Sequence, residues 1–242
     1  MKVLELFSGT HSIGRVCKDR GYEVISLDRD LGGVSKLYDY DNTDNHIQED
    51  IMTWDYKVYP SGIFDIITAS PVCLWWSCMR RAVLPTERIQ NDIDTFGKPM
   101  VDKVIEIIEY FKPKYYWIEN PFTGGMKHYI KERHPNYYNN YVVDYCKYDD
   151  NIGYQKRTIF FTNIKGFTPK KCKKDCKNMS GNRHKVNIAY CNYVIVDNKK
   201  IFTNTKELRE RYKDYERHSQ KRSQSKYQRY SIPYNLVNDL LP

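Results

Sequence analysis

The sequence predicts an α/β fold in which helices cover a mostly parallel β-sheet. Short apolar runs alternate with helical or loop segments through the first half of the chain, and this alternation is typical of parallel sheets wrapped by helices. Between residues 64–69 and 115–118, apolar side chains recur at helical spacing, which predicts a strand, a helix and a strand in succession. The first apolar run also leads into a glycine-containing turn, as in many nucleotide-binding domains.

Four extended segments are the expected strands of this sheet: residues 3–7, 23–27, 64–69 and 115–118. The helix before the last of them must end before Lys112-Pro113, because a residue that precedes proline disfavours the helical conformation. Residues 141–145 and 158–162 are two more extended runs on either side of a polar turn, and they predict a hairpin-like pair.

The chain changes character near residue 165, where the run Lys170-Lys171-Cys172-Lys173-Lys174 is strongly basic. We therefore divide the chain into a main domain at residues 1–164, a small basic module at residues 165–225 and a C-terminal segment at residues 226–242. Apolar residues recur at helical spacing in the last segment, so we expect a helix that packs back on the main domain. Residues 207–217 predict an exposed helix within the module.

Composition narrows the classes of protein that fit. A chain of 242 residues suits one medium domain with a small appendage. No apolar run approaches the roughly 20 residues of a membrane span, and the first residues do not form a secretory signal, so we expect a soluble, intracellular protein. The seven cysteines are then expected to be free thiols or metal ligands, and the net charge of +9 suits a polyanionic partner.

The turn after the first strand predicts a cofactor site. In Ser8-Gly9-Thr10-His11-Ser12-Ile13-Gly14, small residues let the backbone pass close to a ligand, and amides of the following helix would face the ligand's anionic group. Asp28 ends the next strand, where such domains place an acid for a ribose diol, and Asp50 follows a third possible strand. Each acid alone is more often a solvated loop residue, but their succession favours a nucleotide cofactor.

A candidate nucleophile follows residues 64–69 in the segment Ser70-Pro71-Val72-Cys73. Ligands of open α/β sheets gather outside the carboxyl ends of the strands, so this thiol is well placed to react. A lone cysteine is more often an inert core residue. Against that alternative, Trp75 and Trp76 follow closely in the sequence, and aromatic side chains beside a nucleophile suit stacking on a nucleic-acid base.

A candidate acid follows the next strand in the segment Trp117-Ile118-Glu119-Asn120-Pro121. The carboxyl ends of parallel strands share one edge of the sheet, so Glu119 would lie at the same edge as Cys73 and could donate a proton near neutral pH. The alternative is a loop carboxylate with no catalytic role. The pairing with Cys73 favours the catalytic reading of Glu119.

The order of these segments resembles that of the cytosine C5-methyltransferases. Leu6-Phe7-Ser8-Gly9 is similar to the first motif of that family, the segment ending at Cys73 to its Pro-Cys loop, and Glu119-Asn120-Pro121 to its Glu-Asn motif. The segment Gly153-Tyr154-Gln155-Lys156-Arg157 is similar to the later Gln-x-Arg element, and Ser231-Ile232-Pro233 to the last motif. The resemblance implies a Rossmann-like S-adenosylmethionine-dependent methyltransferase fold with a small target-recognition module, closest to small phage and viral enzymes.

The resemblance also implies catalytic roles. Cys73 would add to C6 of a flipped-out cytosine, Glu119 would protonate N3, and Asn120 would help to hold the Glu119 carboxyl group. Gln155 and Arg157 would orient the base and a neighbouring phosphate. After methyl transfer to C5, loss of the C5 proton would release Cys73.

The cofactor implied by the resemblance is S-adenosylmethionine. Phe7 would pack on its adenine, Asp28 would bind the ribose hydroxyls and Asp50 would accept from the adenine amine. The full set of expected cofactor-binding residues is Phe7, Ser8, Gly9, Thr10, His11, Ser12, Ile13, Asp28, Asp50, Ser70 and Pro71.

The basic module carries two further predictions. Cys172, Cys176, His184 and Cys191 are four potential zinc ligands, although free cysteines in a basic surface loop remain the alternative. The side chains expected to contact nucleic acid are Trp75, Trp76, Lys170, Lys171, Lys173, Lys174, Arg183 and Lys185. A solvated charged surface is the alternative for the lysines and arginine.

Two functional alternatives stay open beside a DNA methyltransferase. The same chemistry could act on RNA, as in the tRNA-modifying branch of the family. A catalytically degenerate methyltransferase fold that binds nucleic acid is the other, because Val72, Thr10-His11-Ser12 and Ile159 depart from the family pattern. We expect a monomer with no membrane partner, in the cytoplasm, or in the host nucleus or cytoplasm if the protein is viral.

Overall fold

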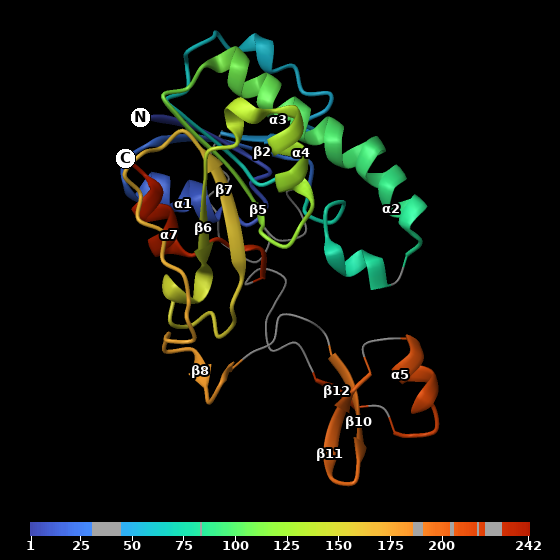
Figure 1. Cartoon of the computed structure of the whole chain (residues 1–242). Coiled ribbons are helices and arrows are strands. Elements are labelled where there is room, and N and C mark those ends of the chain that lie inside the picture. Colours follow the sequence, from blue (N-terminus) through green and yellow to red (C-terminus); the bar gives the residue numbers. More distant parts are fainter. Residues whose placement is uncertain (31–44, 83, 186–190, 204–205, 217, 221–228) are drawn as a thin grey trace.

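The computed structural model describes residues 1–30, 45–82, 84–185, 191–203, 206–216, 218–220 and 229–242. Its centre is a seven-stranded sheet with the order β3-β2-β1-β4-β5-β7-β6 (Figure 1). The strands are β1 (Lys2–Leu6), β2 (Glu23–Asp28), β3 (His46–Gln48), β4 (Ile66–Ala69), β5 (Tyr115–Pro121), β6 (Asn140–Asp144) and β7 (Arg157–Thr162). The predicted α/β class is confirmed.

The sheet has a parallel part and an antiparallel edge. Strands β1 to β5 run parallel to one another, whereas β7 lies antiparallel between β5 and β6. The predicted hairpin-like pair is therefore confirmed, with Asp144 opposite Arg157. Strand β5 continues past its predicted end, so Glu119 and Asn120 lie within the strand and not in the loop after it.

Helices cover both faces of the sheet. Helices α3 (Lys98–Phe111) and α4 (Met126–Arg133) lie on one face, and α1 (Ser12–Asp19) and α7 (Tyr234–Leu240) lie on the other (Figure 1). Alternate residues of a strand point to opposite faces, so Leu4 of β1 joins the core under α3, and Val3 joins the core under α1 and α7. Helix α3 ends at Phe111, as predicted, and Lys112 adopts a left-handed conformation there.

The C-terminal helix α7 packs on α1 through the same core, which includes Leu236, Val237 and Leu240. The loop of residues 70–77 after β4 carries the candidate nucleophile Cys73 and is called the nucleophile loop. Helix α2 (Thr86–Asp92) lies beyond it and continues through the π-helical turn η4 (Ile93–Gly97) into α3. These two segments bring Phe96 beside the nucleophile loop, where its ring stacks on Trp75 with centroids 4.8 Å apart.

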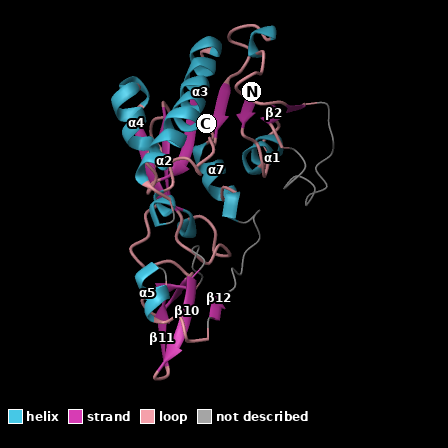
Figure 2. Cartoon of the chain, turned by 90° about the vertical axis from the view of Figure 1, so that its right-hand side faces the viewer, coloured by secondary structure: helices cyan, strands magenta, loops and turns pink. Residues whose placement is uncertain are grey.

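The region after residue 165 forms two small structures. The short strands β8 (Met179–Ser180) and β9 (Arg183–His184) pair with each other. Strands β10 (Cys191–Val196), β11 (Lys199–Phe202) and β12 (His218–Gln220) form a separate sheet that stands apart from the main one, with helix α5 (Lys206–Arg211) beside it (Figures 1 and 2). Helix α5 is shorter than predicted, and the proposed domain division stays a prediction.

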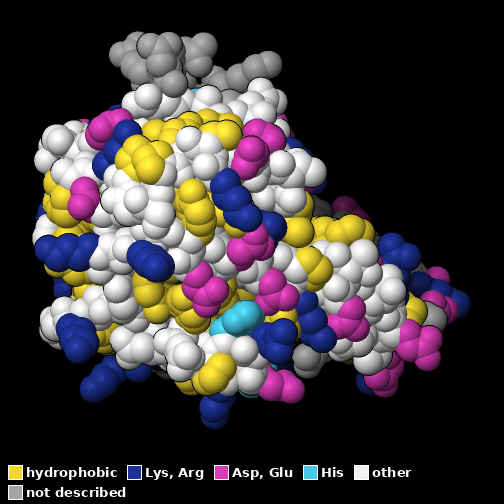
Figure 3. Space-filling model, turned by 90° about the horizontal axis from the view of Figure 1, so that it is seen from above, with side chains coloured by type: hydrophobic (Ala, Val, Ile, Leu, Met, Phe, Trp, Pro, Cys, Tyr) yellow, Lys and Arg dark blue, Asp and Glu magenta, His cyan; other side chains and the backbone are white. Residues whose placement is uncertain are grey.

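Charge is mixed on the face of the main domain that is seen from above in Figure 3. Lysine and arginine side chains lie there among aspartate and glutamate side chains, with no large area of one sign. This face therefore does not explain the net charge of +9 as a polyanion-binding surface. Across the described residues, no helix has the length and apolar character to cross a membrane.

Candidate active site

A cavity of about 870 Å³ lies at the carboxyl ends of β1, β2, β4 and β5. Residues at the ends of all four strands or just after them line it, among them Gly9, Asp28, Cys73 and Glu119. Parallel sheets concentrate ligand-binding groups at this edge because the connections leave the strands there. The volume also lies within the usual range for pockets that hold small molecules.

The nucleophile loop is fixed to the sheet on both sides. Ser70 donates its backbone amide to the Leu6 carbonyl of β1 at 3.3 Å. From the other neighbour of β4, the Asn120 Nδ2 group of β5 donates to the Pro71 carbonyl at 3.1 Å. A turn follows in which the Trp76 amide donates to the Cys73 carbonyl at 3.2 Å. These bonds hold a partly buried Cys73 thiol at the cavity wall.

Glu119 is almost fully buried, with 6% of its surface exposed, yet it lines the same cavity as Cys73. The fully buried Tyr145 donates its hydroxyl to Glu119 Oε1 at 3.1 Å. The Lys156 ammonium lies 3.9 Å from the same oxygen and 4.7 Å from the centre of the Tyr145 ring. The carboxyl group is thus oriented by one neutral donor and one cation.

Both Glu119 and Lys156 shift the pKa of the Cys73 thiol. Burial raises the pKa of the Cys73 thiol above its ordinary value, the Glu119 carboxylate raises it further, and the Lys156 ammonium lowers it. The net shift is upward, so the thiol is the main form at neutral pH. A negative charge on Glu119 and a thiolate at Cys73 therefore disfavour each other.

Asn120 has a different role from the predicted one. Its amide supports the Pro71 carbonyl, whereas Tyr145 and Lys156 contact the Glu119 carboxyl group. The Asn120 side chain is buried, and a Cβ added at Gly124 would lie 3.3 Å from its Oδ1 atom. Asn120 therefore links β5 to the nucleophile loop, and a side chain at position 124 would crowd it.

Most of the predicted cofactor-binding residues line the cavity. Phe7, Ser8, Gly9, Thr10, Ser12, Ile13, Asp28, Asp50, Ser70 and Pro71 all contribute to its wall. Asp28 Oδ2 accepts from the Gly9 amide at 2.9 Å, which joins the turn after β1 to the end of β2. Phe7 has a φ of 59°, a strained value for a bulky residue, and such strain is concentrated at functional sites.

His11 is the exception in that set. It does not line the cavity in the described part of the chain, and it is 4% exposed. Its Nδ1 atom lies 3.8 Å from Glu5 Oε2, and its ring packs edge-on against His46 with centroids 4.5 Å apart. A φ of 50° turns the His11 side chain into the protein interior, so His11 supports the turn from behind.

The expected use of the α1 amides for an anionic ligand is wrong for two of them. Glu5 Oε1 accepts from the amides of Ile13 at 3.3 Å and Gly14 at 3.0 Å. A buried carboxylate thus satisfies the N-terminal donors of the helix from inside the protein. These donors are not directed at the cavity.

Gln155 and Arg157 lie outside the cavity lining in the described residues. Arg157 forms a bidentate pair with the fully buried Asp144, with its Nε and Nη2 atoms at 2.9 and 2.8 Å from the two carboxylate oxygens. Gln155 is exposed on the same segment. Lys156, between them, is the residue that faces Glu119.

Of the two tryptophans predicted to contact nucleic acid, Trp76 is a core residue. It is 6% exposed and belongs to the core under α3, and a Cβ at Gly97 would lie 3.1 Å from its ring. Trp75 does line the cavity and stacks on Phe96, which is 46% exposed. The aromatic surface beside Cys73 therefore comes from Trp75 and Phe96.

The sequence did not predict a functional role for three residues of the site: Tyr145, Lys156 and Arg229. Lys156 lies inside the quoted Gln-x-Arg segment, but its contact with Glu119, like that of Tyr145, depends on the antiparallel pairing of β6, β7 and β5. Arg229 lines the cavity from the C-terminal segment, and its carbonyl accepts from Lys156 Nζ at 3.2 Å. No sequence periodicity signals these contacts.

The predicted basic residues are all exposed: Lys170, Lys171, Lys173, Lys174, Arg183 and Lys185. Lys170 is paired with Asp239 of α7 at 2.8 Å, which reduces its availability to a phosphate. The predicted metal set needs a correction, because Cys172, Cys176 and His184 converge with Cys146. The predicted fourth ligand, Cys191, is the first residue of β10 in the separate sheet, where it lies opposite Gln220 of β12.

Comparison with known proteins shows which sequences this chain is similar to. Residues 1–159 match the family model described as C-5 cytosine-specific DNA methylase. A protein of frog virus 3 (isolate Goorha), named as a probable DNA (cytosine-5)-methyltransferase, is 38% identical over 191 residues, which cover 75% of this chain and 80% of that one.

Two solved structures are also similar, at low identity. A prophage-encoded E. coli chain described as a DNA modification methyltransferase has a TM-score of 0.48 and 14% identity over 84% of this chain. The S. pombe Dnmt2 methyltransferase has a TM-score of 0.46 and 16% identity over 70% of it. This chain spans 63% and 51% of those two chains. The family match and the viral relative show that the chain belongs to the C-5 cytosine-specific DNA methylase family.

Proposed function

We propose that this protein transfers a methyl group from S-adenosylmethionine to C5 of a cytosine in DNA, with Cys73 as the nucleophile and Glu119 as its acid. One observation carries this proposal: a single cavity joins the Cys73 thiol and the Glu119 carboxyl group to the turn after β1 and to Asp28. Family membership supports the reaction and the DNA substrate.

The residues of the cavity fit the cofactor. Ser8 Oγ is buried and has no hydrogen-bond partner among the described residues, although it stands in the cavity wall. The carboxylates of Asp28 and Asp50 and the ring of Phe7 line the same part, and they are suited to ribose hydroxyls, an adenine amine and an adenine face. When bound, S-adenosylmethionine supplies an electrophilic methyl group.

The protein groups divide the chemistry between them. Cytosine C5 is a poor nucleophile, and addition of the Cys73 thiolate at C6 converts the ring into an enamine that reacts at C5. The addition pushes electrons toward N3, where a proton from Glu119 stabilises the adduct. Tyr145 and Lys156 orient the Glu119 carboxyl group for this step.

The Glu119 carboxylate and the Lys156 ammonium act on the Cys73 thiol in opposite directions. The carboxylate raises the pKa of Cys73 and the ammonium lowers it. Transfer of a proton from Glu119 to the base removes no charge from Lys156, so the ammonium stays beside the Cys73 adduct during the reaction.

A cytosine in duplex DNA must leave the stack to reach the cavity. Val72 is 40% exposed and Leu74 is 51% exposed on either side of Cys73, so the loop offers apolar surface to an extruded base and its neighbours. Lys156 and Arg229 supply positive charge at the same cavity, which suits the phosphate of the extruded nucleotide.

Transfer of a labelled methyl group to matched DNA and tRNA substrates tests this function. The proposal expects label in DNA, loss of at least about 10³-fold in rate for Cys73→Ala, and little change for Cys78→Ala, an exposed cysteine outside the cavity lining. Label in tRNA alone would establish the RNA alternative. Binding of DNA with no transfer by the wild-type protein would establish the noncatalytic one.

A further inference from the structure

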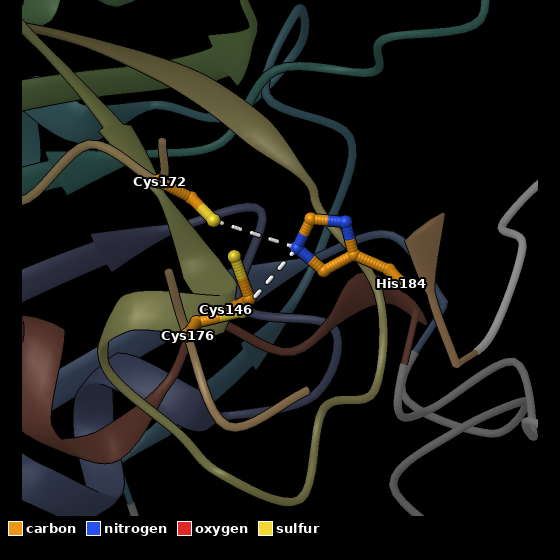
Figure 4. A group of neighbouring side chains, drawn as sticks. All are labelled: Cys146, Cys172, Cys176 and His184. Atoms are coloured by element: carbon orange, nitrogen blue, oxygen red, sulfur yellow. Dashed lines mark hydrogen bonds between the residues drawn. The ribbon is translucent and has the colours of Figure 1, made fainter. Parts of the chain in front are cut away.

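A group of four side chains outside the catalytic cavity has the composition of a metal site. Cys146, Cys172, Cys176 and His184 each offer one ligand atom, and these atoms lie within 4.8 Å of one another. Figure 4 shows the three cysteine side chains and the imidazole ring turned toward one another. Cys146 lies just after β6, and the other three residues lie in the segment that includes β8 and β9.

The two distances between His184 and cysteine sulfur match tetrahedral zinc. His184 Nε2 lies 3.5 Å from Cys172 Sγ and 3.4 Å from Cys176 Sγ. With Zn–S bonds of about 2.3 Å and Zn–N bonds of about 2.0–2.1 Å, a tetrahedral site separates nitrogen and sulfur ligands by about 3.6 Å. The side chains are therefore spaced for one ion to bind between them.

The donor set selects the ion. Three thiolates and one imidazole suit zinc, whereas calcium and magnesium prefer oxygen ligands. Four protein ligands complete a tetrahedral shell, which is the pattern of a structural site and not of a catalytic one. The backbone amides of Lys174 and Asp175 also donate to the Cys172 sulfur, and such donors would stabilise it as a thiolate ligand.

The segment that carries three of the ligands has little else to hold its shape. Among residues 165–185, only the side chains of Cys172 and Asn178 are buried. A segment that lacks an apolar core commonly depends on a metal or on disulfides, and Cys146, Cys172 and Cys176 are free thiols. A metal is therefore the stabilising element that this chemistry offers.

The ligand Cys146 ties the segment to the catalytic domain. It lies in the turn η6 (Tyr145–Lys147), directly after Tyr145, whose hydroxyl contacts Glu119, and close to Asp144, which holds Arg157. The Cys172 amide donates to Asp144 Oδ2 at 2.8 Å, and Lys147 pairs with Asp175 at 3.1 Å. The cluster thus joins the basic segment to the corner of the sheet that orients the acid.

We propose that this protein binds one structural Zn²⁺ ion through Cys146, Cys172, Cys176 and His184, and that the ion fastens residues 165–185 to the end of β6. Three thiolates, one neutral imidazole and a divalent cation leave one net negative charge. Lysines 171, 173 and 174, which are exposed, and Lys147 and Lys177, which are ion-paired, lie beside the ligands in the sequence and would offset this charge.

Metal analysis of the full-length protein, purified without chelators and under reducing conditions, tests the proposal. We expect about one zinc per chain in the wild type and in Cys191→Ser, and less than about a tenth of that in Cys146→Ser and Cys176→Ser. Cys78→Ser is a matched control for loss of an unrelated thiol. Loss of zinc in Cys191→Ser with retention in Cys146→Ser would overturn the assignment of the fourth ligand.

Two further measurements keep the test independent of variants that fail to fold. Cobalt titrated into the chelator-treated wild type is expected to give the intense visible bands of a tetrahedral site with thiolate ligands. Trypsin is expected to cleave at the lysines of residues 165–185 faster after chelation, and zinc is expected to restore resistance. Absence of metal after purification, together with no cobalt bands and no change in cleavage, would refute the site.

Discussion

Lys156 lies close to both Cys73 and Glu119, and its ammonium acts on both side chains. Lys156 lies 3.9 Å from Glu119 and lowers the pKa of Cys73 against the effects of burial and of Glu119. An enzyme that forms a thiolate from a thiol of raised pKa needs such a cation nearby.

The rate of Cys73 alkylation as a function of pH should reveal these influences. Alkylation requires the thiolate, so its midpoint follows the pKa of Cys73. Lys156→Met removes the charge that lowers this pKa, so the midpoint should move to higher pH. Glu119→Gln removes the charge that raises it, so the midpoint should move to lower pH. Peptide mapping with Cys73→Ala as the blank isolates the signal, and equal midpoints in all three proteins would contradict the coupling.

Glu119→Gln also tests the proton transfer itself. An amide cannot donate its proton to N3 as a carboxylic acid does, and general acid catalysis contributes about 10²–10⁴-fold. We expect methyl transfer to slow by that factor while cofactor binding, followed by calorimetry, is unchanged. A rate within about twofold of the wild type would remove Glu119 from its role.

The first turn of helix α1 packs closely against the carboxylate of Glu5 in β1. Glu5 is 2% exposed and receives the amides of Ile13 and Gly14 as well as the Ser26 hydroxyl at 2.9 Å. A Cβ at position 14 would lie 2.6 Å from Glu5 Oε2, which leaves no room for a side chain. Position 14 must be glycine for the helix to reach the carboxylate.

Gly14→Ala should therefore destabilise the protein by about 1–3 kcal/mol, because the helix must move away from Glu5. Gly125→Ala is the matched control, since a Cβ there meets no atom closer than 3.6 Å. Urea unfolding of both variants measures the difference. Equal free energies of unfolding for the two variants would show that α1 has more freedom than the structure indicates.

Sequence patterns predicted elements better than contacts. The apolar runs at residues 64–69 and 115–118 were sufficient for β4 and β5, because buried parallel strands are continuous in their hydrophobicity. Trp76 was assigned wrongly, because a tryptophan next to the nucleophile has the same sequence context whether it faces the cavity or Gly97. Cys146 was missed as a ligand because it lies far along the chain from Cys172, and only the fold joins them.

Across the whole molecule, the lysine side chains differ in how available they are to the phosphates of a nucleic acid. Figure 3 shows mixed charge over one end of the main domain, whereas the exposed lysines of the basic segment lie beyond residue 165. Lys170 is paired with Asp239, but no ion pair involves Lys171, Lys173 or Lys174 among the described residues. These three lysines are therefore the best candidates for phosphate contacts.

DNA binding should reflect this difference in its salt dependence. Each phosphate contact that is lost reduces the slope of log K against log salt concentration by about 1. Lys171→Ala, Lys173→Ala and Lys174→Ala should each produce up to that change, and Lys170→Ala should produce a smaller one. Fluorescence anisotropy over a range of salt concentrations measures the slopes. Unchanged slopes in all four variants would identify the basic segment as a solvated surface.

The central claim is that Cys73 forms a covalent bond to cytosine C6, and trapping that bond tests it most directly. Fluorine at C5 blocks the proton loss that releases the enzyme, so a 5-fluorocytosine duplex with S-adenosylmethionine should leave DNA attached to the wild-type protein through denaturation. We expect the adduct to map to Cys73, to persist in Cys78→Ala and to be absent in Cys73→Ala. A wild-type protein that methylates ordinary cytosine but forms no adduct with the fluorinated duplex, or forms it at another residue, would contradict the account.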